Sequence, residues 1–284
     1  MIERHELTST LYLDLLKKAI LGELYVENEL RLLYLRDCLK GTQAFDMATY
    51  LDIRRRREAA FEEYVTGRAV GINYKRSLEN LGFQHTMIGR KRLENIDYCL
   101  DVILRDRITG DAIECGVWRG GAALYMRGFF AAHCVTDRVV WLADSFEGLP
   151  PPSCAPDEGL DLSADKFPML AIDQDTVKEL FERYGLLDQQ VRFIKGWFKD
   201  TLHSAPIKRL SLLRLDGDLY ESTRDALNAL YSKVEVGGFI IVDDYGLLPM
   251  CQQAVSEFRE RHGITEPIQE IDWSGVYWRK GVRG

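Results

Sequence analysis

The sequence predicts an α/β fold: a Rossmann-like, mostly parallel sheet that ends in an antiparallel hairpin, with helices ahead of it. From about residue 76 onward, short apolar runs alternate with amphipathic stretches of helical spacing, which is the pattern of βαβ units covered on both faces. Two final runs, IQEIDW and GVYWRK, meet at Ser274 and Gly275 and predict the hairpin. Residues 1–75 carry apolar residues at helical spacing and predict a separate helical arm.

Five apolar runs are the expected parallel strands. They are AIECGV (112–117), RVVWLADSF (138–146), VRFIKGWF (191–198), RLSLLRLDGD (209–218) and GGFIIVDDY (237–245). Helices are expected between them, in AALYMRGFFAAH, DTVKELFERYG, STRDALNALYSKV and CQQAVSEFRERHG. We therefore expect two parts, a helical lid over residues 1–75 and a sheet domain over residues 76–284.

The arm is expected to be helical from residue 11 to residue 40. Its apolar residues recur at helical spacing, as Leu13, Leu16, Ile20 and Leu24. The run Arg54 to Arg57 is followed closely by glutamates, so we expect a solvated helix with i,i+4 ion pairs here, and no anion-binding patch. A helix with an apolar face must bury it, either on the rim of its own domain or on a second copy, and we expect a homo-oligomer, a dimer or tetramer. The loop 150–175 is a second candidate lid.

Composition narrows the class of protein. The formal net charge of −7 argues against nucleic acid as the main partner, because a phosphate-binding surface needs a basic excess. No apolar run reaches the roughly 18 to 20 residues that a membrane span requires, and the first residues do not resemble a signal peptide. We expect a cytoplasmic protein without a membrane partner. Six cysteines include no C-x-x-C pair, which excludes a recognisable zinc ribbon or redox motif.

Glycines follow the first expected strand directly, in the segment ECGVWRGG that begins at Glu114. Glycine lets the backbone turn sharply and approach a ligand closely, and the next helix presents free N–H groups. The spacing G-x-x-x-G-G differs from the G-x-G-x-x-G of dinucleotide folds and is typical of a class I methyltransferase turn. Asp144 ends the second strand, 28 residues after Gly116, where an acid can bind both ribose hydroxyls. Singly, either feature could be a tight loop or a turn cap; together they predict a nucleoside site.

Aspartates end two further strands, at Asp216 with Asp218 and at Asp243 with Asp244. Because 27 residues separate Asp216 from Asp243, the length of one strand–helix–strand unit, the two strands are expected to be neighbours. Carboxylates that meet at one edge of a sheet repel one another, and a hard divalent cation resolves the conflict. An all-oxygen ligand set favours Mg²⁺ over zinc. Such a metal lowers the pKa of a hydroxyl that it coordinates, and a nearby carboxylate can take the proton.

Several segments resemble the macrocin O-methyltransferase family, whose members methylate deoxysugar hydroxyls of macrolides and aminocoumarins. They are Thr86-Met87-Ile88-Gly89 with Arg92, Leu93 and Asn95, followed by IECGVWRGG, ADSFEGLP, GWFKDTL, LRLDGDLYEST and VDDYG. The resemblance covers roughly residues 76–284. It departs from the family over residues 26–75, which look longer and more charged than the usual connector.

The resemblance implies a Mg²⁺-dependent O-methyltransferase with a class I fold that uses S-adenosylmethionine on a hydroxyl of a glycosylated small molecule. Asp216, Asp243 and Asp244 would be the metal ligands. Either Asp216 or Asp218 would be the catalytic base, and the sequence does not separate them. The cofactor would be lined by Thr86, Met87, Glu114, Gly116, Val117, Trp118, Asp144, Ser145, Gly196, Trp197 and Asp216. His85 and His203 are rival bases, and we expect both to be surface or structural histidines.

Other functions stay open at this point. The acceptor hydroxyl could belong to a phenol or a polyketide. The chain could also be a nucleoside-binding subunit without catalysis, although such a subunit has no reason to keep the aspartate set together. A short-chain dehydrogenase is disfavoured by the glycine spacing. Tyr64, Tyr74 and the linker GINYKRS come shortly before Thr86 and Met87, and we expect them to close over the bound cofactor.

Overall fold

The computed structural model describes residues 2–70 and 84–281, which belong to two compact units, Met1–Leu93 and Glu94–Gly284. The expected boundary between arm and sheet domain, at residues 75 and 76, lies outside the described residues. The same is true of Tyr74 and the linker GINYKRS. Among the helices that the model describes, none has the length and apolar character needed to cross a bilayer.

The second unit is built on a seven-stranded sheet in the order β3-β2-β1-β4-β5-β7-β6. The strands are β1 (Asp111–Cys115), β2 (Val140–Asp144), β3 (Val191–Lys195), β4 (Leu210–Leu215), β5 (Val234–Val242), β6 (Gln269–Glu270) and β7 (Val276–Arg279). β1 to β5 pair in parallel, and β7 pairs antiparallel with both β5 and β6. The predicted parallel sheet, its closing hairpin and the adjacency of the two aspartate-bearing strands are confirmed.

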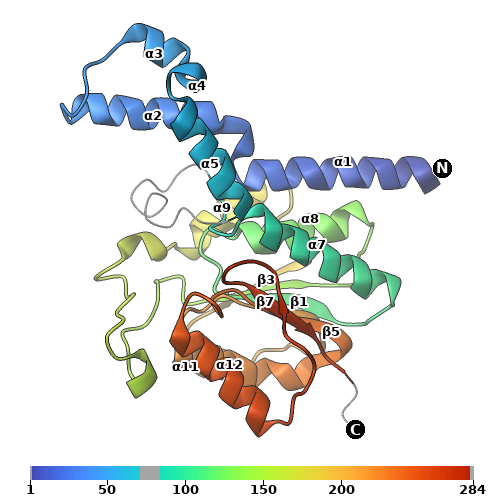
Figure 1. The fold of residues 1–284 in the computed structure, drawn as a ribbon. Coiled ribbons are helices and arrows are strands. Elements are labelled where there is room, and N and C mark those ends of the chain that lie inside the picture. Colours follow the sequence, from blue (N-terminus) through green and yellow to red (C-terminus); the bar gives the residue numbers. More distant parts are fainter. Residues whose placement is uncertain (1, 71–83, 282–284) are drawn as a thin grey trace. The chain divides into compact units, whose positions relative to one another are not determined.

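Helices cover both faces of this sheet. They are α7 (Arg90–Arg105), α8 (Gly121–Ala132), α9 (Gln174–Arg183), α10 (Phe198–Thr201), α11 (Tyr220–Leu230) and α12 (Pro249–Arg261). Figure 1 shows α11 and α12 on one side of the sheet and α7 and α8 on the other. From β1 the chain runs outward through β2 to β3, and after β3 it returns to β4 on the other side of β1, so the strand order reverses between β1 and β4. Ligands of doubly wound sheets bind at such a reversal, outside the carboxyl ends of the strands.

The centre of the sheet explains why its strands read as continuous apolar runs. All six residues of β4 are buried, because β4 lies between β1 and β5 with helices on both faces. Around it, β1, β4 and β5 pack with α11 and α12 into one core that includes Leu213, Leu227 and Trp278. The register aligns Cys115, Leu215 and Val242 across the three strands. The residues that follow these three positions therefore emerge side by side.

The first unit is helical, as predicted, but its first helix is shorter than expected. It contains α1 (Ile2–Ile20), η1 (Glu23–Tyr25), α2 (Val26–Leu39), α3 (Met47–Leu51), α4 (Ile53–Arg56) and α5 (Glu58–Val70). The predicted continuous helix over residues 11–40 is wrong, because Gly22 adopts a left-handed φ of 67° and breaks it. Leu13, Leu16 and Ile20 are buried as expected. Leu24 lies beyond the break and is 47% exposed.

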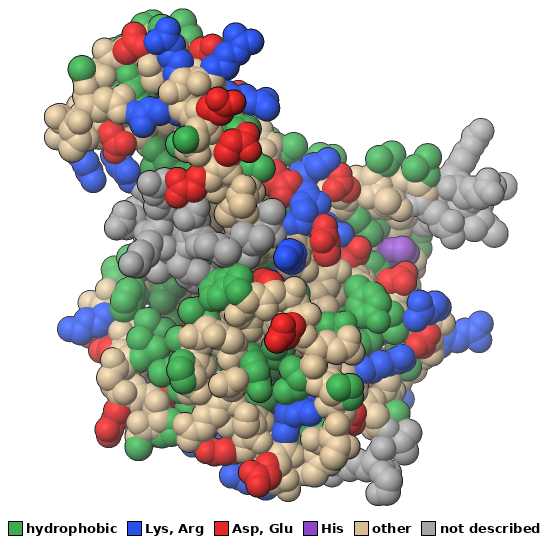
Figure 2. All heavy atoms as spheres, viewed as in Figure 1, with side chains coloured by type: hydrophobic (Ala, Val, Ile, Leu, Met, Phe, Trp, Pro, Cys, Tyr) green, Lys and Arg blue, Asp and Glu red, His purple; other side chains and the backbone are tan. Residues whose placement is uncertain are grey.

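Charges of both signs are interspersed over this arm. Arg55 lies near Asp52 and Arg56 near Asp46, and all three arginines from Arg54 to Arg56 are exposed. Figure 2 shows the mixture at the top of the view, where blue and red side chains alternate without a basic patch. Beneath them, Val26, Leu30, Tyr34, Ile53 and Tyr64 form a small apolar core that joins α2, α4 and α5.

Gly116 shows how tightly the strand ends are packed. It has a φ of 91°, and a Cβ at this position would lie 1.7 Å from the backbone oxygen of Asp216. Gly159 has nearly the same φ, 94°, but a Cβ there would meet nothing within 4 Å. The two glycines therefore separate the cost of the backbone conformation from the cost of the contact with β4.

We predict that Gly116→Ala destabilises the protein by about 4 kcal/mol, or roughly 10 °C in Tm, because overpacking adds to the left-handed strain. Gly159→Ala carries only the strain and should cost about 1 to 2 kcal/mol. Thermal unfolding of both variants beside the unchanged chain is the measurement. Equal losses of Tm in the two variants would show that the contact with Asp216 does not constrain residue 116.

Candidate active site

The carboxyl ends of five strands are held level by backbone hydrogen bonds that continue the parallel ladder past the last paired residues. These bonds fix the backbone from β3 across to β5. The residues that follow each strand therefore have fixed positions relative to one another. The four bonds run from Gly196 N to Asp144 O (2.9 Å), from Gly116 N to Ala143 O (2.9 Å), from Asp216 N to Cys115 O (2.8 Å) and from Asp243 N to Leu215 O (2.9 Å).

Three carboxylates meet after β4 and β5. Asp216, Asp243 and Asp244 each offer an oxygen, and these oxygens lie within 4.8 Å of one another. Asp243 and Asp244 are buried, with 2% of each exposed, and Asp216 is half-buried. The sequence predicted that these three would lie together, and the structure brings them together. Oxygen ligands in this number and spacing suit a hard divalent cation such as Mg²⁺.

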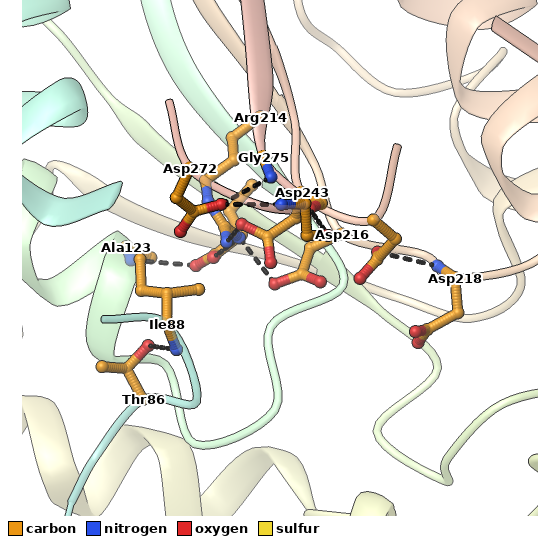
Figure 3. Close-up of polar contacts among 12 residues, drawn as sticks. Thr86, Ile88, Ala123, Arg214, Asp216, Asp218, Asp243, Asp272 and Gly275 are labelled. Atoms are coloured by element: carbon orange, nitrogen blue, oxygen red, sulfur yellow. Dashed lines mark hydrogen bonds and ion pairs between the residues drawn. The ribbon is translucent and has the colours of Figure 1, made fainter. Parts of the chain in front are cut away.

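A buried arginine, which sequence reasoning missed, lies behind this cluster. Arg214 is on β4, fully buried, and its guanidinium contacts Glu114 (2.5 Å), Asp216 (2.8 Å) and Asp243 (2.5 Å). Figure 3 shows Arg214 beside Asp216 and Asp243. It therefore joins the ends of β1, β4 and β5 by charge-assisted hydrogen bonds. A single charged residue in the apolar run LSLLRL was the available signal.

Four carboxyl groups gather around Arg214. Among the described residues, they belong to Asp216, Asp243, Asp244 and Glu114. Removing such groups from water is costly, and bound cations are a common solution. The oxygen donor set of the three aspartates therefore fits a divalent metal.

The hairpin holds Asp243 from the far side. Ser274, which is 1% exposed, donates its hydroxyl to the backbone oxygen of Asp243 at 2.7 Å. The turn that carries Ser274 is itself fixed, because the Asp272 carboxylate accepts the backbone N–H groups of Ser274 and Gly275 at 3.0 and 2.8 Å. The closing hairpin thus serves as a brace for the aspartates after β5.

Asp218 differs from the three clustered aspartates. It has a left-handed φ of 58°, and its backbone N–H donates to Asp244 Oδ2 at 3.3 Å. Its carboxylate points away from the cluster (Figure 3). Desolvation raises the pKa of Asp218 to about 7, and the charges of Asp216 and Asp243 add to that shift. The two candidate bases therefore have different surroundings, since Asp216 is paired with Arg214 and Asp218 is not among that residue's contacts.

Glu114 ends β1 and points inward, with 2% exposed. One carboxylate oxygen accepts the backbone N–H of Ala123 in the first turn of α8 at 2.8 Å, and the other contacts Arg214. Burial raises the pKa of Glu114 to about 8, although Arg214 opposes this shift. Glu114 thus ties the helix after the glycine turn to β4, the strand that leads to Asp216 of the carboxylate cluster.

Asp144, the predicted ribose ligand, also holds the glycine turn. Its carboxylate accepts the backbone N–H of Val117 at 2.6 Å and that of Phe146 at 2.8 Å. Burial raises the pKa of Asp144, and these backbone hydrogen bonds oppose the shift. Ser145 follows it and donates its hydroxyl to Gly148 O at 2.6 Å. The turn-cap interpretation is therefore correct for Asp144, and a carboxylate has further acceptor sites that a ribose could use.

The remaining predicted cofactor residues surround the same edge of the sheet. Trp118 has a φ of 46° and donates its indole N–H to Met169 O at 3.0 Å. Gly196 has a φ of 135°, which suits glycine, and Trp197 is half-buried at the start of α10. His203 is exposed, as expected of a surface histidine.

Thr86 and Met87 belong to the first unit. Thr86 is 6% exposed, and its hydroxyl accepts the Ile88 backbone N–H at 3.4 Å. Met87 is half-buried. Their assignment to the cofactor stays a prediction.

We predict that Arg214→Met destabilises the protein by about 3 to 5 kcal/mol, because Glu114 and two aspartates lose their buried cation. With a pKa of about 8 against the ordinary 4.5, Glu114 contributes stability that is complete below pH 4.5 and is lost as the pH rises towards 8. Since Arg214 holds that pKa down, the deficit of the variant should be larger at pH 8 than at pH 5. Denaturant unfolding at both values measures it.

Arg127→Met is the matched control for this prediction. Arg127 is 7% exposed and pairs with Asp188, whose side chain is 42% exposed. Because water can hydrate Asp188 when its partner is lost, this variant should lose less stability and show little difference between the two pH values. If Arg214→Met behaved like Arg127→Met, the guanidinium would not be the main compensating charge of the site.

Comparisons with known proteins agree with this arrangement. The solved structure of the O-methyltransferase NovP matches with a TM-score of 0.78 and 42% identity, covering 96% of this chain and 100% of that one. The calicheamicin methyltransferase CalS11 matches with a TM-score of 0.54, 20% identity and coverage of 67% and 79% of the two chains, which shows a shared fold. The class I methyltransferase fold predicted from the sequence is confirmed.

Relatives of known activity resemble the chain over most of its length. An 8-demethyl-8-(2,3-dimethoxy-alpha-L-rhamnosyl)-tetracenomycin-C 4'-O-methyltransferase of Streptomyces olivaceus is 52% identical, over 69% of this chain and 75% of its own. Demethyldecarbamoylnovobiocin O-methyltransferase of Streptomyces niveus is 51% identical, over 69% and 76%. Mycinamicin III 3''-O-methyltransferase of Micromonospora griseorubida is 42% identical, over 96% and 97%.

The match with the family begins earlier than the sequence motifs indicated. The family model of macrocin-O-methyltransferase (TylF) matches residues 9–280. Residues 26–75 therefore lie within the match to the family, and the Micromonospora relative aligns over nearly the full length of both chains. The alternative of a subunit without catalysis is also set aside, since these relatives are enzymes. The chain belongs to the macrocin-O-methyltransferase family and is an O-methyltransferase.

Proposed function

We propose that this enzyme transfers the methyl group of S-adenosylmethionine to a sugar hydroxyl of a glycosylated natural product, with Mg²⁺ held by Asp216, Asp243 and Asp244. The observation that carries the proposal is the carboxylate cluster after β4 and β5, whose oxygens lie within 4.8 Å of one another. It adjoins the glycine turn after β1, because β1 and β4 are neighbouring strands.

The names of the relatives support a sugar as the acceptor. The relative from Streptomyces olivaceus acts, by its name, on a rhamnosyl tetracenomycin, and the others act on demethyldecarbamoylnovobiocin and mycinamicin III. These acceptors are natural products, and the first is named by its sugar. A phenolic or polyketide hydroxyl is the second candidate, and a panel of glycosylated and sugar-free acceptors distinguishes the two. Methylation of sugar-free acceptors alone would contradict our proposal.

The cofactor is expected to lie along the ends of β1, β2 and β3. The start of α8, whose N-cap Gly120 makes no side-chain cap hydrogen bond, favours a negatively charged group on that side. Asp144 ends β2, and its carboxylate accepts the backbone N–H groups of Val117 and Phe146. An acid at the end of the second strand is where a ribose would be bound. Ser145, Trp118, Gly196 and Trp197 would line the rest, with Thr86 and Met87 at the amino-acid end.

The reaction requires a hydroxyl to lose its proton while it approaches the methyl group. A bound divalent metal supplies polarisation, which lowers the pKa of a coordinated hydroxyl. Asp216, Asp243 and Asp244 would hold it, and Arg214 and Ser274 keep Asp216 and Asp243 oriented for that role. The chain's part is then mainly positioning, since a sulfonium methyl needs little activation.

We assign the base to Asp218 in preference to Asp216. Asp216 pairs with Arg214 at 2.8 Å, and a cation so close weakens a carboxylate as a proton acceptor. Asp218 lies two residues further along, outside the cluster, where its carboxylate can face an acceptor hydroxyl without giving up a metal ligand. It would take the hydroxyl proton onto a carboxylate oxygen as the new O–CH3 bond forms and the S–CH3 bond breaks, with S-adenosylhomocysteine as the leaving group.

The helical arm is proposed to provide a contact with a second copy and walls for the acceptor. On α1, Leu7, Leu11 and Leu15 recur every four residues and are 62%, 62% and 55% exposed. Such a stripe on one helix face is the pattern that isologous dimers bury.

We predict that different substitutions impair the metal-dependent turnover and the binding of the cofactor separately. Asp243→Asn and Asp244→Asn should lose about 100-fold or more in turnover while their affinity for S-adenosylhomocysteine stays unchanged, because asparagine keeps the size of the side chain and one acceptor oxygen but removes the charge that would bind the metal. EDTA should abolish turnover of the unchanged enzyme and Mg²⁺ should restore it. Turnover assays with titration calorimetry measure both properties.

Asp144→Ala is the complementary variant, which should impair cofactor binding and keep the metal requirement. Asp173→Asn is its control. Asp144→Ala should weaken S-adenosylhomocysteine binding about tenfold or more and keep its requirement for Mg²⁺, because the glycine turn loses its anchor. Asp173 caps α9 through Thr176, and asparagine caps as well as aspartate, so Asp173→Asn should leave both properties unchanged. Full activity after rigorous metal removal would refute the metal-dependent mechanism.

We predict that Leu11→Glu reduces the size of the oligomer, because a charge in the centre of the α1 stripe opposes its burial. Leu32→Glu is the matched control, since Leu32 on α2 is 52% exposed but does not belong to that stripe. Light scattering of the three proteins at equal concentration measures particle mass. A mass unchanged by Leu11→Glu would exclude the α1 stripe as the subunit contact.

A further inference from the structure

Asp157 is a fully buried carboxylate to which the reaction as described gives no role. It lies in the loop between β2 and α9, in the short 3₁₀ turn η2 (Ala155–Asp157), and 0% of it is exposed. Its oxygens accept the backbone N–H of Tyr220 at 2.7 Å and that of Glu221 at 3.2 Å, and Cys154 Sγ lies 3.2 Å away. A carboxylate so completely removed from water needs such donors.

The carboxylate oxygens of Asp157 cap the N-terminus of α11 in place of an N-cap side chain. α11 begins at Tyr220, and its own N-cap residue, Leu219, makes no side-chain cap hydrogen bond. The first N–H groups of a helix lack partners within that helix. Here a residue 63 positions earlier in the chain satisfies two of them. The nearby Ser153 hydroxyl also donates to the Glu221 carboxylate, so the loop is attached to this helix end at two points.

The capped helix end follows directly on a strained turn. Leu219 N donates to Gly217 O at 2.6 Å, which places Asp218 in the middle of a three-residue turn with its φ of 58°. A non-glycine residue in this conformation persists only where its surroundings hold it. On the β5 side the holding contact is Asp244, which accepts the Asp218 N–H. On the helix side it is Asp157, which fixes the residue two positions after Asp218.

We propose that Asp157 is a positioning residue for the base: by capping α11 from the β2–α9 loop, it keeps Asp218 in its strained conformation. This inference rests on the proposed role of Asp218. Without the cap, the first turn of α11 can fray, and Asp218 can relax to an ordinary negative φ that carries its carboxylate elsewhere. The other end of the same loop is tied to the glycine turn, where Met169 O accepts the Trp118 indole N–H at 3.0 Å. The loop thus spans from the cofactor turn to the base.

Asp157→Ala, Asp157→Asn and Asp173→Ala test this inference. Asp173 also caps a helix, accepting the Thr176 N–H at 2.8 Å, but on α9, away from Asp218. Both alanine variants should lower Tm, Asp157→Ala by more, because Asp157 is buried and Asp173 is exposed. Only Asp157→Ala should lower kcat, by about tenfold or more, with KM for S-adenosylmethionine changed less than about threefold. Asp157→Asn keeps an oxygen for the Tyr220 N–H and should recover most of kcat. A rhamnosyl tetracenomycin serves as the acceptor.

Two further measurements distinguish a failure of the proposed role of Asp157 from a failure of the proposed role of Asp218. Asp218→Asn in the same assay tests the base itself: if it retains the kcat of the unchanged enzyme, the proposed function of Asp218 fails independently of Asp157. If Asp218→Asn is inactive and Asp157→Ala matches Asp173→Ala in kcat, the positioning role is overturned. If no acceptor is methylated, Mg²⁺ titration decides, because Asp244 bonds to the same turn. Asp157→Ala should then weaken Mg²⁺ binding about fivefold, and unchanged affinity would refute the inference.

Discussion

The buried guanidinium of Arg214 is the interaction on which the rest of the site depends. Neighbouring parallel strands end level, so the acidic residues that follow them are forced together, and repulsion among them would push the strand ends apart. Arg214 stands behind them on the central strand and bonds to carboxylates from β1, β4 and β5. The clustered acids are thereby made compatible with a stable sheet. Because Glu114 also accepts an N–H from α8, the same network extends to the glycine turn.

Around this centre, the backbone is shaped by close contacts more than by flexibility. Gly116 is a glycine because the backbone of Asp216 fills the place of its side chain. Asp144 and Ser274 use their side chains to fix backbone groups of the turns beside them. Several residues that were predicted to bind a ligand therefore also stabilise the backbone around them. Substituting them tests two properties at once, which is why paired controls are needed to interpret a loss of activity.

Much of the fold could be predicted from the sequence, because apolar runs with alternating helices report burial directly. The adjacency of Asp216 and Asp243 followed from their spacing in the sequence. The suitability of their oxygens for a hard divalent cation followed from the residue type. Arg214 and Asp157 could not be found in the same way. Arg214 sits in an apolar strand, where only its partners explain it, and those partners come from positions up to 100 residues away. Asp157 lies in an irregular loop, and its role depends on a helix end 63 residues later. The break at Gly22 was missed because apolar periodicity continues across it.

The loop between β2 and α9 has a consequence for altering which acceptors the enzyme takes. Loops at the ends of strands are natural places to exchange segments between relatives, since the scaffold beneath them stays intact. Here the loop is not an independent module: it contributes Asp157 to α11 and Met169 to the glycine turn. A chimaera that imports this loop must therefore bring an equivalent acid in the same place. Otherwise a change intended for acceptor choice would also disturb the catalytic centre.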